Sequence, residues 1–284
     1  MRERIYADQA LSIYYTMDEN PVDVTFSMHT HFKAELYYLI SGDGVFHVEG
    51  TQYPLQAGDI LLMRPSEAHY VALSSTKPYA RMVISFDMNL FDGIEGDQNF
   101  LRAFTDRESG KGNLYRRSDF ENWNCDNYID IMRKHPGNRM AAIGALTMLL
   151  SAVNSVFDTA LPAHAEKNTI EVDILRYINA HLSEELSLDT LAQRYFISRA
   201  QLCRRFKKVT GTSMGKYITA KRMIAAQNML LSGKKPSEVY IHCGFEDYST
   251  FYRSYVRYYG HSPKDLRFDL EESGAEHYHF IDQT

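Results

Sequence analysis

The stretch that decides the fold is LSLDTLAQRYFISRAQLCRRFKKVTG, residues 186–211, whose pattern returns as PSEVYIHCGFEDYSTFYRSYVRYYG at residues 236–260. Each copy predicts a short helix, a turn and a second helix with apolar residues at helical spacing, such as Leu202 and Phe206 in the first and Phe251 in the second. The residues that face away in the first copy are basic, which suits entry into a major groove of DNA. One copy alone would be equally well explained as a solvated helical pair, whereas two copies in tandem favour DNA binding.

A wider set of residues resembles the AraC/XylS family of transcription regulators. The matching positions are Leu191-Ala192, Ser198, Leu202, Phe206-Lys207-Lys208, Gly211, Tyr217, Arg222, Ala226, Leu230, Gly244-Phe245, Phe251, Gly260, Ser262-Pro263 and Arg267. The resemblance implies a DNA-binding domain over residues 169–267 with two helix-turn-helix motifs, preceded by a cupin-like sensor domain. Met214, Pro236 and Tyr240 depart from the family pattern, and the last two bear on the packing of the second motif.

The resemblance also assigns DNA contacts to the second helix of each motif. The residues are Ala200, Gln201, Cys203, Arg204, Lys207 and Lys208 in the first motif, and Tyr248, Ser249, Tyr252 and Arg253 in the second. Arg204 and Arg253 are the best candidates for base contacts, because a guanidinium can bond to guanine O6 and N7 together. Lys207 and Lys208 are expected on phosphates. A joining helix predicted over residues 213–231 would be about 28 Å long and would let both motifs reach successive major grooves.

The charge distribution agrees with one cationic region. The 284-residue chain has a formal net charge of −5, yet residues 168–267 carry 16 Lys and Arg against 9 Asp and Glu, and the tail at 268–284 is acidic. A cationic segment beside anionic ones fits attraction to DNA phosphates. The three cysteines, Cys125, Cys203 and Cys243, lack zinc-ligand spacing and favour a reducing compartment. With no apolar signal segment at the start, we predict a cytoplasmic protein with no membrane partner.

In residues 1–118, short runs of alternating apolar and polar residues are separated by turn residues. This pattern predicts an antiparallel barrel or sandwich. The segments GVFHVEG, TQYPLQ and DILLM, within residues 44–63, are expected strands. The predicted fold class is α+β with two domains: a cupin-like β-barrel (jelly roll) with a helix pair, then an all-α tandem helix-turn-helix domain.

Several polar residues of this barrel form a candidate site. They are His29, His31, Glu35, Tyr37, His47 and His69. The first four are odd-numbered and share one face of an extended chain. The spacing of His29, His31 and Glu35 resembles the first cupin motif, and Gly58 to His69 is similar to a relaxed second one. The resemblance implies that in metal-binding cupins the positions of His29, His31, Glu35 and His69 are the ligands, a set that suits a divalent transition metal. We favour the alternative, an effector pocket for a sugar or another metabolite that requires no cofactor.

Residues 119–158 predict a helix pair, with an N-cap at Asp119 and a break at His135-Pro136-Gly137. The second helix has more apolar residues than one buried stripe uses, namely Met140, Met148, Leu149 and Val156. This surplus indicates a homodimer contact or, alternatively, burial within the monomer. Residues 159–168 have the composition of a linker.

These features predict an effector-controlled transcription regulator that binds double-stranded DNA as a homodimer. As the expected activator, it would also contact RNA polymerase. The alternative is a metal-dependent cupin enzyme with an accessory DNA-binding module, and a third hypothesis is an architectural DNA binder without an effector.

Overall fold

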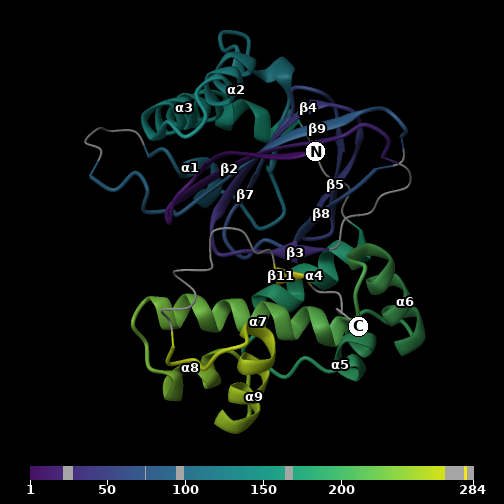
Figure 1. The fold of residues 1–284 in the computed structure, drawn as a ribbon. Coiled ribbons are helices and arrows are strands. Elements are labelled where there is room, and N and C mark those ends of the chain that lie inside the picture. Colours follow the sequence, from purple (N-terminus) through teal and green to yellow (C-terminus); the bar gives the residue numbers. More distant parts are fainter. Residues whose placement is uncertain (22–27, 74, 94–98, 164–168, 266–277, 280–284) are drawn as a thin grey trace. The chain divides into compact units, whose positions relative to one another are not determined.

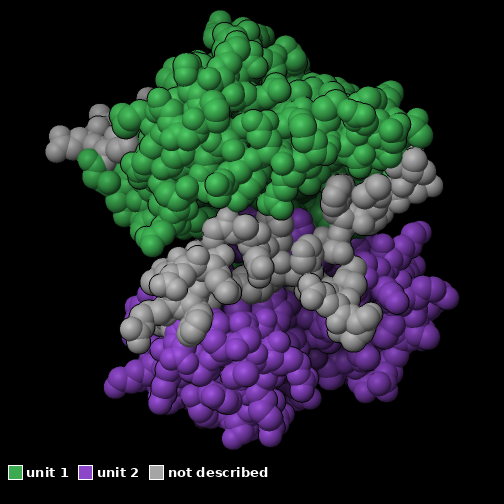
Figure 2. Space-filling view, viewed as in Figure 1, with its two compact units in different colours: residues 1–26, 33–167 green, residues 27–32, 168–284 purple. Residues whose placement is uncertain are grey.

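The computed structural model describes residues 1–21, 28–73, 75–93, 99–163, 169–265 and 278–279. The chain forms two compact units, one of residues 1–26 and 33–167 and the other of residues 27–32 and 168–284 (Figure 2). The first is built from β-sheets and helices and the second is mainly helical (Figure 1), so the predicted two-domain α+β class is confirmed. Most of the acidic tail and half of the predicted linker, residues 164–168, lie outside the described residues.

The first unit contains antiparallel strands in two sheets. The larger sheet has the order β1-β2-β9-β4-β7-β10. Its strands are β1 (Arg2–Ala7), β2 (Leu11–Asp18), β9 (Tyr79–Phe86), β4 (Ala34–Ser41), β7 (Ile60–Met63) and β10 (Leu114–Tyr115). The other sheet contains β8 (His69–Ala72), β5 (Gly44–Val48) and β6 (Thr51–Leu55) in that order. Strands β5, β6 and β7 are the three strands predicted within residues 44–63.

Strand β4 shows how alternation sorts side chains between two cores. Its even-numbered Leu36 and Tyr38 belong to the core that the helices share with the larger sheet. Its odd-numbered Tyr37 and Leu39 belong to a second core, to which both sheets contribute. Because successive side chains of a strand point to opposite faces, Glu35 lies on the same inner face as Tyr37. The shared face predicted for these two residues is confirmed.

Helices α2 (Cys125–Lys134) and α3 (Arg139–Ala163) cover the outer face of the larger sheet (Figure 1). The prediction that Asp119 caps the first of them is wrong. Asp119 instead closes a short 3-10 turn, η1 (Arg117–Asp119), where its carboxylate accepts a 2.6 Å hydrogen bond from the Arg116 backbone N–H. The helix α2 begins six residues later than that cap, because the nearer turn already uses the carboxylate.

Two of the four surplus apolar residues on α3 are covered within the unit. Leu149 is fully buried and Val156 packs against the core, so for these two residues burial in the monomer is the correct alternative. Met140 and Met148 remain exposed, at 77% and 40%. The segment Arg139–Thr159 is long and apolar enough to cross a membrane, by length and composition only, and 44% of its most apolar window is buried inside the protein.

Residues 169–265, the main described part of the second unit, contain six helices. They are α4 (Ile170–Ala180), α5 (Leu188–Arg194), α6 (Arg199–Thr210), α7 (Met214–Leu231), α8 (Pro236–His242) and α9 (Tyr248–Tyr259). Helices α5 and α6 form the first helix-turn-helix motif, α8 and α9 the second, and α7 joins them (Figure 1). In the same unit β3 (His29–Thr30) pairs antiparallel with β11 (Tyr278–His279).

Candidate DNA interface and effector pocket

The recognition helices α6 and α9 are built in the same way. Ser198 caps α6 by accepting a 3.2 Å hydrogen bond from the Gln201 N–H, and Asp247 caps α9 by accepting a 2.8 Å bond from the Thr250 N–H. Both helices end at a glycine in the left-handed region, at φ 71° and 78°. A left-handed glycine satisfies the last carbonyl groups of a helix and stops it. Sequence repetition therefore reflects two structural copies of one motif.

The outer face of α6 carries the predicted reading residues. Ala200, Cys203, Arg204, Lys207 and Lys208 are all exposed. Arg204, Lys207 and Lys208 thus present hydrogen-bond donors on one face of α6, as the recognition of phosphate and guanine requires.

Gln201 differs from these residues because it belongs to the helix start. Its side-chain carbonyl accepts a 3.1 Å hydrogen bond from the Ser198 N–H, which completes a capping box. Gln201 therefore has a local structural role at the start of α6.

On α9, Ser249, Tyr252 and Arg253 are exposed, but Tyr248 is half-buried. The Tyr248 ring packs edge-on against Tyr240, with their centroids 6.0 Å apart. Tyr240 therefore packs against Tyr248, and the DNA contact assigned to Tyr248 stays a prediction. The other departure in this motif, Pro236, occupies the first turn of α8, where a missing N–H costs nothing.

The joining helix α7 holds the two motifs together. Its 18 residues correspond to a length of about 27 Å. The guanidinium of Arg222 donates hydrogen bonds of 2.9 and 2.7 Å to the carbonyls of Leu182 and Glu184, just after α4. Five residues later, buried Gln227 accepts a hydrogen bond from the Tyr255 hydroxyl of α9. Arg222 is therefore structural, and contacts in the middle and in the C-terminal half of α7 hold the helix to its neighbours.

Polar groups also gather on the inner face of the first unit. Glu35 of β4 and His69 of β8 are both buried, and their side chains approach to 3.7 Å. The ring of His69 stacks on Phe46 with centroids 5.8 Å apart. His69 Nδ1 lies 2.8 Å from the carbonyl oxygen of Glu67. Since a carbonyl only accepts, Nδ1 carries a proton, and Nε2 is the ring nitrogen that faces Glu35.

Two residues of this inner face, Tyr79 and Arg81 of β9, were missed in the sequence. They alternate in step with Val83, which packs in the inner core. The guanidinium of Arg81 lies 5.2 Å from the centre of the Tyr79 ring, and the Tyr79 hydroxyl bonds to that of Tyr37. Burial opposes the charge of Arg81, but the neighbouring Tyr79, Tyr37 and Glu35 raise its pKa.

The predicted metal set is only partly assembled. His31, Glu35 and His69 offer ligand atoms that all lie within 4.8 Å of one another, and His29 is not part of this group. The donor set suits a transition metal, because a carbonyl bond at Nδ1, as His69 has, is what orients Nε2 in metal-ligating histidines.

His47 lies on the opposite face from the predicted pocket. Its neighbours on β5, Phe46 and Val48, belong to the inner core, so alternation turns His47 outward. There its ring stacks on Tyr70 at 4.2 Å. The prediction that His47 lines the effector site is therefore wrong. Burial lowers the pKa of His47 to about 4.

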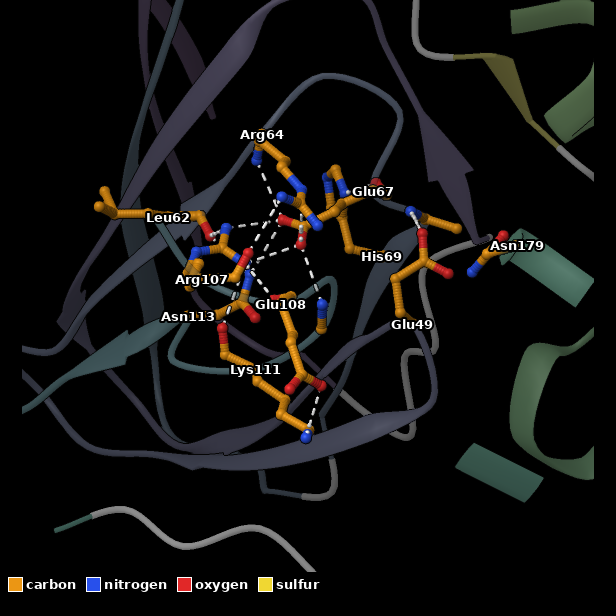
Figure 3. Close-up of polar contacts among 12 residues, drawn as sticks. Glu49, Leu62, Arg64, Glu67, His69, Arg107, Glu108, Lys111, Asn113 and Asn179 are labelled. Atoms are coloured by element: carbon orange, nitrogen blue, oxygen red, sulfur yellow. Dashed lines mark hydrogen bonds and ion pairs between the residues drawn. The ribbon is translucent and has the colours of Figure 1, made fainter. Parts of the chain in front are cut away.

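A buried ion pair stands directly beside His69, and the sequence did not suggest it (Figure 3). The carboxylate of Glu67 accepts two hydrogen bonds from the Arg107 guanidinium, at 2.7 and 2.8 Å, and both side chains are 1% exposed. The same carboxylate accepts the Gly110 N–H and the Asn113 amide. Burial alone would raise the pKa of Glu67, but the Arg107 charge and these hydrogen bonds outweigh it and lower the pKa to about 2.

The chain matches two known domains. Residues 14–150 match the AraC-like ligand binding domain, and residues 191–268 match a helix-turn-helix domain. The Msm operon regulatory protein of Streptococcus mutans is 20% identical over 284 residues, covering 93% of this chain and 99% of that protein. The transcriptional activator RhaS of Escherichia fergusonii is 22% identical over 261 residues, covering 85% and 87%. A crystal structure of apo ToxT from Vibrio cholerae aligns with a TM-score of 0.41 at 10% identity, covering 93% and 99%. With a ligand-binding and a helix-turn-helix match in this order over most of its length, the chain belongs to the AraC family of transcriptional regulators, which are DNA-binding proteins and not enzymes.

Proposed function

We propose that this regulator is an activator, acting in the cytoplasm, whose binding to its operator is controlled by a small polar metabolite such as a sugar. The observation that carries the proposal is the inner face of the first unit, where Glu35 lies 3.7 Å from His69 and interacts with the charge of Arg81, and where His69 stacks on Phe46. Converging polar groups with an aromatic wall are typical of pockets for polar ligands. The ligand acts only by the difference in its affinity for the DNA-competent and incompetent states.

The Glu35→Gln variant tests the pocket. In a thermal-shift screen of monosaccharides and other polar metabolites, a ligand at a hundred times its Kd stabilises the wild type by about 2.7 kcal/mol. We expect Glu35→Gln to lose most of that shift, because the neutral amide has one accepting oxygen instead of two and bonds ligand hydroxyls more weakly than a charged carboxylate does. The matched control is His47→Gln, which changes a buried side chain on the outward face of β5 and should keep the shift.

The screen includes Zn²⁺ and Ni²⁺ as probes, because the donor set also fits a divalent ion held by His31, Glu35 and His69. Metal at one equivalent in elemental analysis of the purified wild type, lost in Glu35→Gln, would replace the metal-free pocket that we propose. An equal response of Glu35→Gln and wild type to every active metabolite would move the effector site elsewhere.

For DNA, we propose that Arg204 reads a guanine and that Arg253 makes the corresponding contact from α9. An operator selected from random duplexes by the wild-type chain provides the substrate. Arg204→Ala should weaken binding to it by about 1–3 kcal/mol and relax the preference at one base pair. Lys207→Ala is the control, since loss of a phosphate contact weakens all sequences alike. Full discrimination by Arg204→Ala would contradict the assignment.

We also propose that two chains bind the operator and that the exposed Met140 and Met148 lie in the contact between them. Two copies that pair through a two-fold axis present the same surface to each other, so one apolar patch per chain suffices. As an activator, the DNA-bound regulator would contact RNA polymerase. The mass of the operator complex shows whether it holds one chain or two.

A further inference from the structure

The turn between α5 and α6 carries an unusual residue. Phe196 is 95% exposed, the highest value of any large apolar side chain in the described part of the chain. Its φ is 53°, in the left-handed region. A bulky residue at positive φ is strained, because its Cβ crowds the backbone. Two unfavourable properties therefore coincide at one position.

The second motif shows that the turn does not need this side chain. Phe196 and Gly244 occupy the same place: their N–H groups donate to Gln193 and Ile241 at 3.2 and 3.1 Å. Gly244 has a φ of 74° and makes the same turn without strain. A glycine would therefore serve the backbone at position 196 better than phenylalanine does.

The core does not need the ring either, since a side chain that is 95% exposed contributes no burial. A strained residue that stabilises neither its turn nor its core is a reason to look for a binding partner. The neighbouring residues indicate which kind. Gln193, Arg194, Ser198 and Arg199 are exposed and polar, so in this stretch Phe196 is an isolated apolar side chain among polar ones.

A lone ring on such a surface fits DNA better than it fits a protein, because protein docking sites present a contiguous apolar core. Phe196 also lies three residues before Arg199, the first residue of recognition helix α6. In this motif the N-terminal end of the recognition helix contacts the bases. An apolar ring near base edges has one specific target, the C5-methyl group of thymine.

We propose that Phe196 is a specificity-determining residue that packs against a thymine methyl group in the major groove read by α6. The turn thus adds an apolar contact to the hydrogen bonds with guanine that we propose for Arg204. This inference rests on the DNA binding of the chain and adds a base preference to it.

The experiment uses the full-length chain and the operator selected by the wild type. Phe196→Gly should melt at the same temperature or higher, because glycine relieves the strain, yet it should bind the operator about five- to fiftyfold more weakly. Phe196→Tyr keeps the ring and should retain most of the affinity. Ile241→Ala, which truncates an exposed apolar residue on α8, is the control and should leave affinity unchanged.

Replacing each operator thymine in turn by uracil removes its methyl group and locates the contact. The wild type should lose affinity at one such position, and Phe196→Gly should show no further loss there. The proposal is overturned if Phe196→Gly binds as the wild type does, or if both chains lose equally at every uracil position. A lower melting temperature for Phe196→Gly would also overturn it, by showing a structural role. If the wild type selects no operator, the proposed regulator function itself fails.

Discussion

Replacing Arg107 with leucine should destabilise the first unit by about 3–5 kcal/mol, because it removes the guanidinium that bonds both carboxylate oxygens of buried Glu67 and leaves the partly exposed Arg64, at 3.5 Å, as the remaining countercharge. The two bonds that join Arg107 to this carboxylate lie between side chains that are 1% exposed, so water cannot take over. Equilibrium urea unfolding of the full chain, followed by the fluorescence of its single Trp, Trp123 in the first unit, measures the loss.

Two companion variants separate charge from packing. The double variant Arg107→Leu, Glu67→Leu removes both charges and should recover much of the stability, since an apolar pair of similar volume often equals a buried ion pair. Lys77→Ala breaks an exposed pair with Asp43, whose side chains are 71% and 38% exposed, and should cost less than about 1 kcal/mol. If Arg107→Leu cost no more than Lys77→Ala, the buried pair would contribute nothing.

The same pair should give the unit a defined acid sensitivity. Because the folded state lowers the pKa of Glu67 from 4.5 to about 2, its stabilising effect is complete above pH 4.5 and is lost as the pH falls toward 2. The double variant lacks this carboxyl group. Its stability should therefore fall less steeply than that of the wild type over the same pH window.

Gly244→Ala should destabilise the second unit by about 2–4 kcal/mol, from left-handed strain together with overpacking. A Cβ at this position would lie 2.3 Å from the carbonyl oxygen of Leu182 and 2.8 Å from the guanidinium of Arg222. That carbonyl accepts a hydrogen bond from Arg222, so the methyl group would separate α7 from the end of α4. Thermal unfolding measures the stability, and operator affinity should fall because the two motifs lose their fixed spacing.

Gly233→Ala is the matched control. Gly233 has a φ of +88°, but no atom lies within 4 Å of a Cβ added there. It should therefore show only the conformational cost, about 1–2 kcal/mol. Equal losses for the two variants would mean that the contact between Leu182, Arg222 and Gly244 does not tie the motifs together.

The elements with strong local periodicity could be predicted from the sequence. The two helix-turn-helix motifs, the strands within residues 44–63 and the inner face shared by Glu35 and Tyr37 all follow from spacing that a single segment contains. Arg204 and Arg253 are exposed for the same reason, as they lie opposite the buried stripe of their own helices. In each case the pattern and the cap residues point to one structure.

The errors arose where a remote partner decides the outcome. Odd-numbered residues face the inner core on β4, whereas even-numbered residues face it on β5. His47 therefore lies on the opposite face from Glu35 and Tyr37. Asp119 could cap a helix, but its carboxylate accepts a hydrogen bond from the nearby Arg116 N–H instead. Arg107 and Glu67 are separated by 40 residues and neither belongs to a periodic stripe. Tyr248 is half-buried because its ring packs against Tyr240 of α8. The spacing of residues within α9 cannot predict a contact with another helix.

The anchoring of α7 by Arg222 and Gln227 also bears on how such a regulator evolves. These two residues hold the helix to its neighbours, while the side chains proposed to contact DNA, such as Arg204 and Arg253, belong to α6 and α9 and take no part in those contacts. Mutation can therefore exchange the recognised bases one exposed residue at a time without altering the distance between the two recognised segments. Descendants of this protein should diverge in operator sequence while they inherit the operator's length.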